Sequence, residues 1–271
     1  GEPEAIRCAV EETPDGYSVT GADGIATRLV AVNSAAPRYV FEIDGLRRAG
    51  IESAIYEAWP YSKGIGGGLQ IAPNGMQVMD EIGLAGELIS RGSVAESFDF
   101  YSQGGERLGS INRDMARRFG QPAVNVCRAT LNEMLIDKAW CACASLYFDK
   151  RLIKIEDRGD QPIIAYFADG TIAEGDFLIG ADGVHSVVRK KIVGDGDPPP
   201  AGAVIYRATI PADEMPKDLQ QPYPTFWAGP DWHVIYYPMR DWSVFNLGCT
   251  VVSDQTPPND GEEVTPHYVL P

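Results

Sequence analysis

Two hydrophobic periods alternate along the first two thirds of the chain. Short apolar runs with a period of two residues predict strands, and longer runs with apolar positions every three or four residues predict helices. Strands are expected at residues 27–32, 53–56, 146–148, 152–155, 163–167 and 177–179. Helices are expected near 43–49, at 74–91 and at 130–142. This alternating order of strands and helices is typical of an α/β fold.

Two details refine the pattern. Within the long helix expected at 74–91, the large apolar side chains on or near one face are Met76, Met79, Ile82 and Ile89. The sequence Ala168-Asp-Gly-Thr is typical of a hairpin turn between two strands. The strands around this turn predict a small antiparallel excursion within the α/β order.

Residues 195–200, with the sequence Asp-Gly-Asp-Pro-Pro-Pro, mark the clearest boundary in the chain. Three successive prolines cannot continue a helix or a central strand. Beyond them, a sheet with one covered face is predicted from four alternating runs, at residues 204–210, 225–227, 233–239 and 243–252. We therefore expect a first domain at 1–198 and a smaller sheet domain at 199–271.

The most informative stretch is Leu178–Arg189, which runs from an apolar strand through glycines into a basic helix. Gly180 and Gly183 allow positive φ and close approach of the backbone, and Asp182 places a carboxylate at the mouth of the turn. An isolated Asp-Gly turn more often ends a strand than it binds a ligand. The complete stretch is much rarer than that dipeptide.

This stretch resembles the internal Asp-Gly motif of the single-component FAD-dependent aromatic hydroxylases, which include salicylate and hydroxybenzoate hydroxylases. Three further segments resemble the family in the order of its own motifs: Gly45–Glu57, Gly66–Leu84 and Val126–Leu135. The resemblance extends over roughly residues 45–250. It implies an α/β fold in which an FAD-binding, Rossmann-like three-layer domain precedes a partial antiparallel-sheet substrate domain.

The resemblance also assigns cofactor contacts. The residues concerned are Glu57, Gly66, Gly67, Gly68, Arg128, Asp182, Gly183 and Arg189. Glu57 ends the second strand, at about the position of the family's ribose-binding acid, although an ordinary strand-end carboxylate is an equal alternative. The three consecutive glycines resemble the family's glycine loop, and Arg128 resembles an arginine that touches the cofactor. Asp182 and Arg189 belong to the motif that contacts the FAD pyrophosphate and NAD(P)H.

Three features depart from the family pattern. The first dinucleotide turn, normally G-x-G-x-x-G, corresponds here to Ser34-Ala-Ala-Pro-Arg-Tyr39, in which all three glycines are missing. The family's C-terminal Gly-Asp-Ala-x-His-x-x-x-Pro stretch is not reached before Pro271. Residues 1–28 match no family segment, and either replace the usual start or form an extra hairpin. We therefore expect a truncated relative with a degenerate first turn.

The resemblance implies a specific reaction. NAD(P)H reduces FAD, O2 adds to the reduced ring as a C4a-hydroperoxide, and a small aromatic substrate is hydroxylated. The departures favour an alternative, a truncated and non-catalytic relative that binds a ligand or a partner protein. Retention of the acid, the arginine and the Asp-Gly motif favours the enzyme. Truncation also predicts exposed apolar surface and therefore self-association.

The second region offers candidates for an aromatic-acid pocket. They are Tyr206, Arg207, Trp227, His233, Tyr236 and Tyr237. We expect substrate contacts from Arg207, His233 and Tyr237, with Arg207 pairing a substrate carboxylate. Because side chains alternate along a strand, Tyr236 and Tyr237 are sent to opposite faces. Ordinary packing within the sheet is the competing interpretation for each residue.

The acidic composition limits the partners. The chain has 23 basic and 38 acidic residues and a net charge of −15, which argues against non-specific binding to nucleic acid or anionic membranes. No run approaches the ~18 apolar residues of a membrane span. Five scattered cysteines lack the spacing of a metal site and favour free thiols in a reducing, cytoplasmic compartment. A small aromatic molecule is therefore the expected partner.

Overall fold

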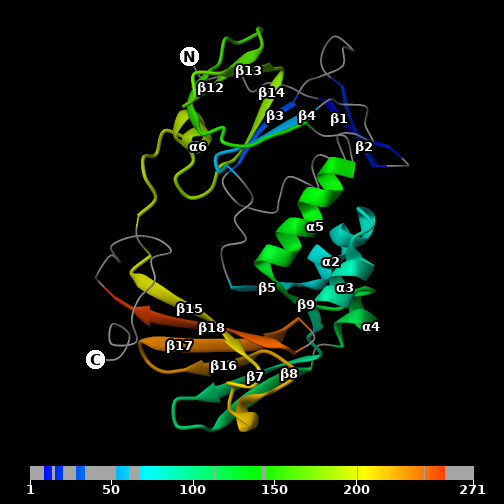
Figure 1. Ribbon diagram of the computed structural model, residues 1–271, viewed down its shortest axis with the longest axis vertical. Coiled ribbons are helices and arrows are strands. Elements are labelled where there is room, and N and C mark those ends of the chain that lie inside the picture. The colour runs from blue at the N-terminus through cyan, green and yellow to red at the C-terminus, as the bar shows by residue number, and fades with distance from the viewer. Residues whose placement is uncertain are drawn as a thin grey trace. The chain divides into compact units, whose positions relative to one another are not determined.

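Contacts divide the chain into two units, each built from separate stretches of sequence. The computed structural model describes residues 9–13, 16–20, 29–33, 53–60, 67–112, 114–141, 145–199, 201–240 and 242–253. Unit 1 combines residues 1–63 with 132–198, and unit 2 combines 64–131 with 199–271 (Figure 1). The change at residue 198 lies in the predicted proline boundary. Residues 64–131 depart from the contiguous division that we expected.

A four-stranded parallel sheet forms the centre of unit 1. Its strands are β3 (Leu29–Asn33), β4 (Ser53–Glu57), β10 (Ser145–Tyr147) and β14 (Phe177–Ala181). The spatial order is β10-β4-β3-β14, so the chain first builds outward on one side of β3 and then crosses to the other side. This reversal beside the first strand is the topological switch point of a doubly wound fold, which confirms the α/β prediction.

An antiparallel meander and a short helix cover one face of this sheet. The meander contains β11 (Leu152–Glu156), β12 (Ile163–Phe167) and β13 (Ile172–Gly175), and the helix is α6 (Val187–Ile192). Their buried side chains, Leu152, Ala165, Phe167, Ala173 and Val188, form one cluster against which Tyr56 packs. The rings of Tyr56 and Phe167 stack with centroids 4.8 Å apart. The predicted antiparallel excursion therefore forms a layer of the core.

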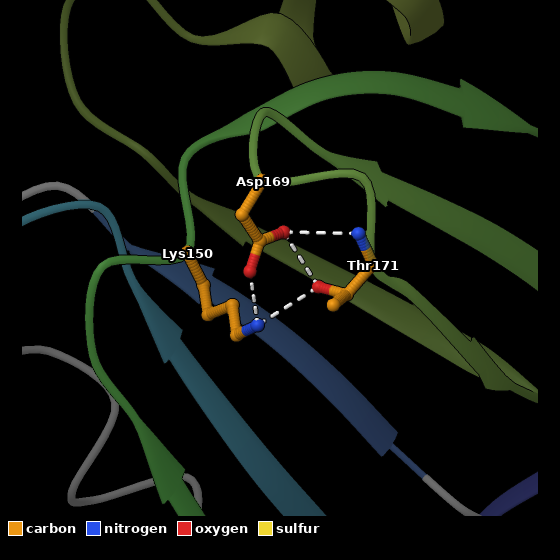
Figure 2. Close-up of polar contacts among 3 residues, drawn as sticks. All are labelled: Lys150, Asp169 and Thr171. Atoms are coloured by element: carbon orange, nitrogen blue, oxygen red, sulfur yellow. Dashed lines mark hydrogen bonds and ion pairs between the residues drawn. The ribbon is translucent and has the colours of Figure 1, made fainter.

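The predicted hairpin turn at residues 168–171 joins β12 to β13. Figure 2 shows that Asp169 Oδ1 accepts hydrogen bonds from the backbone N–H of Thr171, at 3.0 Å, and from the hydroxyl of Thr171, at 2.7 Å. The ammonium of Lys150 donates to Asp169 Oδ2 and, at 2.8 Å, to the Thr171 hydroxyl. Because the backbone N–H of Lys150 also bonds to the carbonyl of Glu57, at 2.7 Å, the hairpin is tied to the end of β4.

A separate hairpin lies near the N-terminus. Strands β1 (Ala9–Thr13) and β2 (Gly16–Thr20) pair in antiparallel orientation with Ala9 opposite Thr20 and Thr13 opposite Gly16. This is the extra hairpin that we gave as one of two alternatives for residues 1–28. The helix expected near 43–49 lies outside the described residues.

A six-stranded sheet dominates unit 2. Its strands, in spatial order, are β15 (Ala203–Pro211), β18 (Val244–Val252), β17 (Trp232–Met239), β16 (Thr225–Ala228), β7 (Ser97–Ser102) and β8 (Arg107–Asn112). All neighbours are antiparallel except β16 and β7, which are parallel. The four strands predicted after residue 203 are therefore present. Pairing of β7 with β16 is the reason that residues 64–131 group with unit 2.

Unit 2 also contains a smaller sheet, three α-helices, the short 3-10 helix η1 (Lys217–Leu219) and the first residues of α5. The sheet has the order β5 (Gly68–Ile71), β9 (Val124–Cys127) and β6 (Ser93–Val94). The helices are α2 (Pro73–Glu81), α3 (Ala85–Arg91) and α4 (Met115–Phe119). Helix α5 (Arg128–Cys141) corresponds to the helix expected at 130–142 and passes from unit 2 into unit 1 in the chain.

The prediction of a single long helix at 74–91 is wrong, because this segment forms two helices, α2 and α3. Its apolar period continues through residues 82–84, but Gly83 has a φ of 74°, which ends α2 and separates it from α3. Met76, Met79 and Ile82 are buried as expected, whereas Ile89 is exposed. In α3 the fully buried residue is Leu88. After the break, the buried face of α3 no longer continues the apolar face of α2, so Leu88 points to the core in place of Ile89.

Lys150 is expected to control the ionisation of Asp169. Hydrogen bonds from Lys150, and then from Thr171, lower the pKa of Asp169 to about 2. Since this lies below the unfolded value of about 3.9, the ionised carboxylate stabilises the fold above about pH 4 and loses that contribution as the pH falls toward 2. In Lys150→Met, a 13C NMR titration of the Asp169 carboxyl should give a pKa close to the ordinary value.

The matched control is Lys154→Met, because Lys154 pairs with Glu156. That variant should leave the titration of Asp169 unchanged. An unchanged Asp169 midpoint in Lys150→Met would show that the ammonium is not the cause.

Candidate functional site

Three strand ends of unit 1 stand at the same level. Asn33 of β3 is aligned with Glu57 of β4 on one side and with Ala181 of β14 on the other. Neighbouring strands lie about 4.8 Å apart, so Glu57 and the turn that follows Ala181 lie roughly 10 Å apart at one edge. Ligands of doubly wound sheets bind outside these carboxyl ends, at the switch point. The edge formed by Glu57 and the Asp-Gly turn is therefore the first part of the candidate site.

Glu57 is a buried carboxylate held by the following loop. Its Oε1 accepts the backbone N–H of Trp59 at 3.0 Å, and only 9% of the residue is exposed. A buried carboxylate is costly unless hydrogen bonds satisfy it, and each of its oxygens can accept more than one. The loop therefore fixes the direction of the acid at the end of β4.

Asp182 organises the turn between β14 and α6. Its Oδ2 accepts the backbone N–H groups of Val187, at 2.7 Å, and Val188, at 3.2 Å, while its Oδ1 accepts the hydroxyl of Ser186. Ser186 in turn accepts the backbone N–H of Arg189 at 2.9 Å. These bonds satisfy N–H groups that a helix start leaves without intrahelical partners. Asp182 therefore determines the geometry of the turn.

Glycines let the turn and the helix approach the sheet. Gly183 has a φ of 78°, a conformation that L side chains rarely adopt. A Cβ on Gly180 would lie only 2.5 Å from Cγ1 of Val188. Gly180 therefore serves close packing of α6 on β14, which is one of the three functions that glycines have in dinucleotide-binding turns.

The basic side chains of α6 are engaged by the loop that follows it. The guanidinium of Arg189 forms an ion pair with Asp195, and the ammonium of Lys190 pairs with Asp197 at 2.5 Å. Both bases remain partly exposed, at 42% and 45% of their side chains. Surface pairs of this kind contribute little stability, so Arg189 can exchange its partner at low cost.

The glycine loop lies in unit 2 and packs on the large sheet. The carbonyl of Gly67 accepts the backbone N–H of Arg128 at 3.1 Å, and the N–H of Gly68 donates to Asn246 Oδ1 at 2.5 Å. A Cβ on Gly68 would lie 2.6 Å from both Met239 Sδ and Tyr237 Cε2. The two glycines are therefore required for contact between β5 and the β17–β18 pair. Gly66 and the first turn at 34–39 lie outside the described residues.

The three predicted substrate residues share one face of the six-stranded sheet. Arg207 is aligned with Gly248 of β18, which is aligned with Ile235 of β17. Because His233 and Tyr237 are two residues from Ile235 on either side, all three candidates point to this side, which we call the substrate face. Arg207 is exposed, His233 is half-buried and Tyr237 is buried.

The other three candidates lie on the opposite face, so the six candidates do not line one common surface. Tyr206, Trp227 and Tyr236 alternate with the substrate-face residues. Tyr236 and Trp227 pack with Phe245 and Met215 in an apolar cluster. Packing was the competing interpretation, and for these two side chains it is the one the structure gives. Tyr236 and Tyr237 point to opposite faces as predicted.

Aromatic rings that the sequence did not single out lead across the substrate face to His233. Phe226 of β16 stacks on His233 with centroids 5.0 Å apart, and Phe100 of β7 contacts Phe226 at 5.9 Å. Burial raises the pKa of Tyr237 to about 12, an effect that the charge of Arg207 partly offsets. The tyrosine is therefore a neutral phenol at physiological pH. The face combines flat apolar surface, a cation and a hydrogen-bonding hydroxyl.

Two further statements hold for the described residues. They contain no cluster of three or more histidine, cysteine or acidic side chains that is able to hold a metal ion. None of the helices in this part of the chain combines the length and the apolar character required to span a membrane.

Removal of the Asp182 carboxylate is expected to destabilise unit 1. Asp182→Ala deletes acceptors for Ser186, Val187 and Val188, so the free energy of unfolding should fall by about 1–2 kcal/mol. Urea unfolding followed by circular dichroism measures the change. Glu174→Ala, at an exposed strand position, is the control and should change stability by less than about 0.5 kcal/mol. Equal effects of both substitutions would contradict this role for Asp182.

Comparisons with known proteins agree with the geometry. The family model described as FAD binding domain matches residues 44–199, more than half of the chain. The chain is 34% identical over 232 residues to 3-hydroxybenzoate 6-hydroxylase 1 of Aquipseudomonas alcaligenes, covering 83% of the chain and 58% of the relative. It is 32% identical over 221 residues to 3-amino-4-hydroxybenzoate 2-monooxygenase of Streptomyces cremeus, covering 80% of the chain and 55% of the relative.

A solved structure gives the same result for the fold. The 2,6-dihydroxypyridine-3-hydroxylase of Arthrobacter nicotinovorans aligns with a TM-score of 0.72 and 25% identity, over 86% of this chain and 58% of that one. The chain thus spans little more than half the length of the curated relatives that it matches. It belongs to the FAD-binding domain family, and the curated relatives named above are hydroxylases and monooxygenases of hydroxybenzoates.

Proposed function

We propose that the protein uses FAD, NAD(P)H and O2 to hydroxylate a small aromatic substrate that carries a carboxylate. The observation that carries the proposal is the level alignment of Glu57, Asn33 and Ala181 at the switch point of a sheet that belongs to the FAD-binding family. The names of both curated relatives describe reactions on aromatic carboxylates, 3-hydroxybenzoate and 3-amino-4-hydroxybenzoate. Oxygenation of such a compound is the reaction that we infer.

The residues at the edge of the parallel sheet fit a dinucleotide. Glu57 ends the second strand, and its fixed carboxylate suits the hydroxyl groups of a ribose. The Asp182–Gly183 turn stands two strands away at the same level, where a pyrophosphate would cross the sheet edge, and Arg189 supplies a cation there. In unit 2, Gly67, Gly68 and Arg128 form the second group of candidate cofactor contacts.

Bound FAD would accept a hydride from NAD(P)H and activate O2 for transfer of one oxygen atom to the ring. The side chains of the substrate face then orient the ring. Arg207 pairs with the carboxylate through a planar, bidentate guanidinium. Tyr237 contributes a neutral hydroxyl at the buried end of this face, and His233, stacked on Phe226, is the candidate for exchanging a proton with a phenolic substrate.

Further properties follow from the same proposal. A reaction that consumes NAD(P)H suits the cytoplasm, a reducing compartment in which free thiols such as Cys127 and Cys249 persist. Self-association stays a prediction.

FAD binding is the first test. Titration of the chain with FAD, followed by quenching of flavin fluorescence, should saturate in the micromolar range. Glu57→Gln removes the charge that would hold the ribose and should raise the dissociation constant about tenfold, which corresponds to loss of one charge-assisted hydrogen bond. Glu174→Gln, at an exposed position of β13, should leave the constant unchanged.

Two results would count against the proposal. Absence of quenching by FAD at any protein concentration would favour the alternative, a non-catalytic relative that binds another ligand or a partner. Normal FAD binding by Glu57→Gln would leave the cofactor assignment intact but remove Glu57 from it.

Arg207 provides a test of the substrate assignment. In the presence of FAD, 3-hydroxybenzoate should perturb the flavin absorbance, and Arg207→Ala should weaken this binding by roughly ten- to a hundredfold because the carboxylate loses its bidentate partner. Arg207→Lys keeps the charge but not the planar fork, so an intermediate affinity is expected. Equal affinity in the wild-type protein and in Arg207→Ala would show that the carboxylate binds elsewhere.

A further inference from the structure

The peptide group between Gly67 and Gly68 is held from both of its polar ends. Its carbonyl oxygen, on Gly67, accepts the backbone N–H of Arg128 at 3.1 Å. Its N–H, on Gly68, donates to Asn246 Oδ1 at 2.5 Å in a buried contact between residues 178 positions apart. A peptide bond is planar, so two hydrogen bonds to its opposite ends fix the orientation of the whole plane.

The packing around this peptide leaves little space for another arrangement. A Cβ on Gly67 would overlap Asn246 Oδ1, and a Cβ on Gly68 would overlap the ring of Tyr237, with 2.8 Å to its hydroxyl. Asn246 is 3% exposed and Tyr237 is 5% exposed. The backbone of β5 therefore lies directly on the side chains of β17 and β18.

Asn246 and Tyr237 are aligned neighbours on the substrate face. β17 and β18 pair with Tyr237 opposite Asn246, so both side chains leave the sheet on the same side. One of them hydrogen-bonds the glycine loop and the other underlies it. The loop assigned to the cofactor and the face assigned to the substrate thus meet at this pair.

We propose that Asn246 is a positioning residue that fixes the Gly67–Gly68 peptide on the substrate face and so sets the distance between bound cofactor and bound substrate. The Gly68 N–H donates to the Asn246 side chain, which is the acceptor that orients this end of the peptide. The consequence for cofactor and substrate rests on the proposed function. The two hydrogen bonds that hold the Gly67–Gly68 peptide, which we call the clamp, do not depend on the proposed function.

The first experiment measures the clamp without any ligand. In Asn246→Leu the branched side-chain shape is retained but the acceptor is lost, which leaves a buried N–H unpaired. Hydrogen exchange by NMR should show the Gly68 amide at least tenfold less protected relative to the amides of β9. Asn246→Asp keeps the Oδ1 acceptor and should restore protection. Thr209→Val, on the strand next to Asn246 in the same row, is the matched control and should change nothing.

A double-mutant cycle tests the steric part. Gly67→Ala should lower the urea midpoint of unfolding sharply, because the new methyl overlaps Asn246 Oδ1. In the Asn246→Ala background the overlap is gone, so the same substitution should have a much smaller effect. Additive effects of the two substitutions would overturn the proposed contact.

The final readout separates positioning from stability. With FAD, NADH or NADPH, and 3-hydroxybenzoate, Asn246→Leu should hydroxylate a several-fold smaller fraction of substrate per NAD(P)H oxidised, and Asn246→Asp should recover that fraction. A fraction equal to wild type in the Leu variant would overturn the positioning role. If the wild-type protein fails to bind FAD, the proposed function fails, while exchange at Gly68 and the double-mutant cycle still decide whether the clamp exists.

Discussion

In-register parallel pairing of β4, β3 and β14 is the constraint on which the candidate site at the edge of the parallel sheet depends. Since the pairs Glu57–Asn33 and Asn33–Ala181 have no register shift, the acid and the Asp-Gly turn stand at one level. A shift by one residue would send each side chain to the opposite face of the sheet. Packing of Tyr56, Phe167 and Val188 in one apolar cluster on this sheet opposes such a shift. Core packing on the sheet thus stabilises the register of these strand ends.

Close backbone approach, more than turn flexibility, explains the glycines of the candidate site. Gly180 allows Val188 of α6 to lie on β14, and Gly67 and Gly68 allow β5 to lie on Asn246 and Tyr237. A single methyl at any of these positions would overlap a neighbouring side chain. Cores respond to such overlap by shifting backbone or rotamers, at a cost of about 1–3 kcal/mol. Gly67, Gly68 and Gly180 are therefore explained by tertiary contacts within the chain.

Because side chains alternate along β15, β17 and β18, the candidate substrate residues and the packed aromatic residues of unit 2 lie on opposite faces of the sheet. One face carries Arg207, His233 and Tyr237, whereas the other buries Tyr236 beside Phe245 and Met215. The two faces make different demands, because a ligand needs exposed or partly exposed polar groups and a core needs apolar contact. The same strands supply both, and this explains why only three of the six residues considered for a pocket, Arg207, His233 and Tyr237, point to the substrate face.

Local sequence determined most elements, the Asp-Gly turn and the opposite directions of Tyr236 and Tyr237, because periodicity and turn chemistry act over a few residues. It did not reveal the break between α2 and α3 at Gly83, because the apolar period of the sequence continues across this glycine. It also did not reveal β7 and β8, whose place in the sheet depends on the pairing of β7 with β16. The bond from Asn246 to Gly68 has no sequence signal. It joins segments 178 residues apart, and only tertiary packing brings an acceptor to that particular N–H.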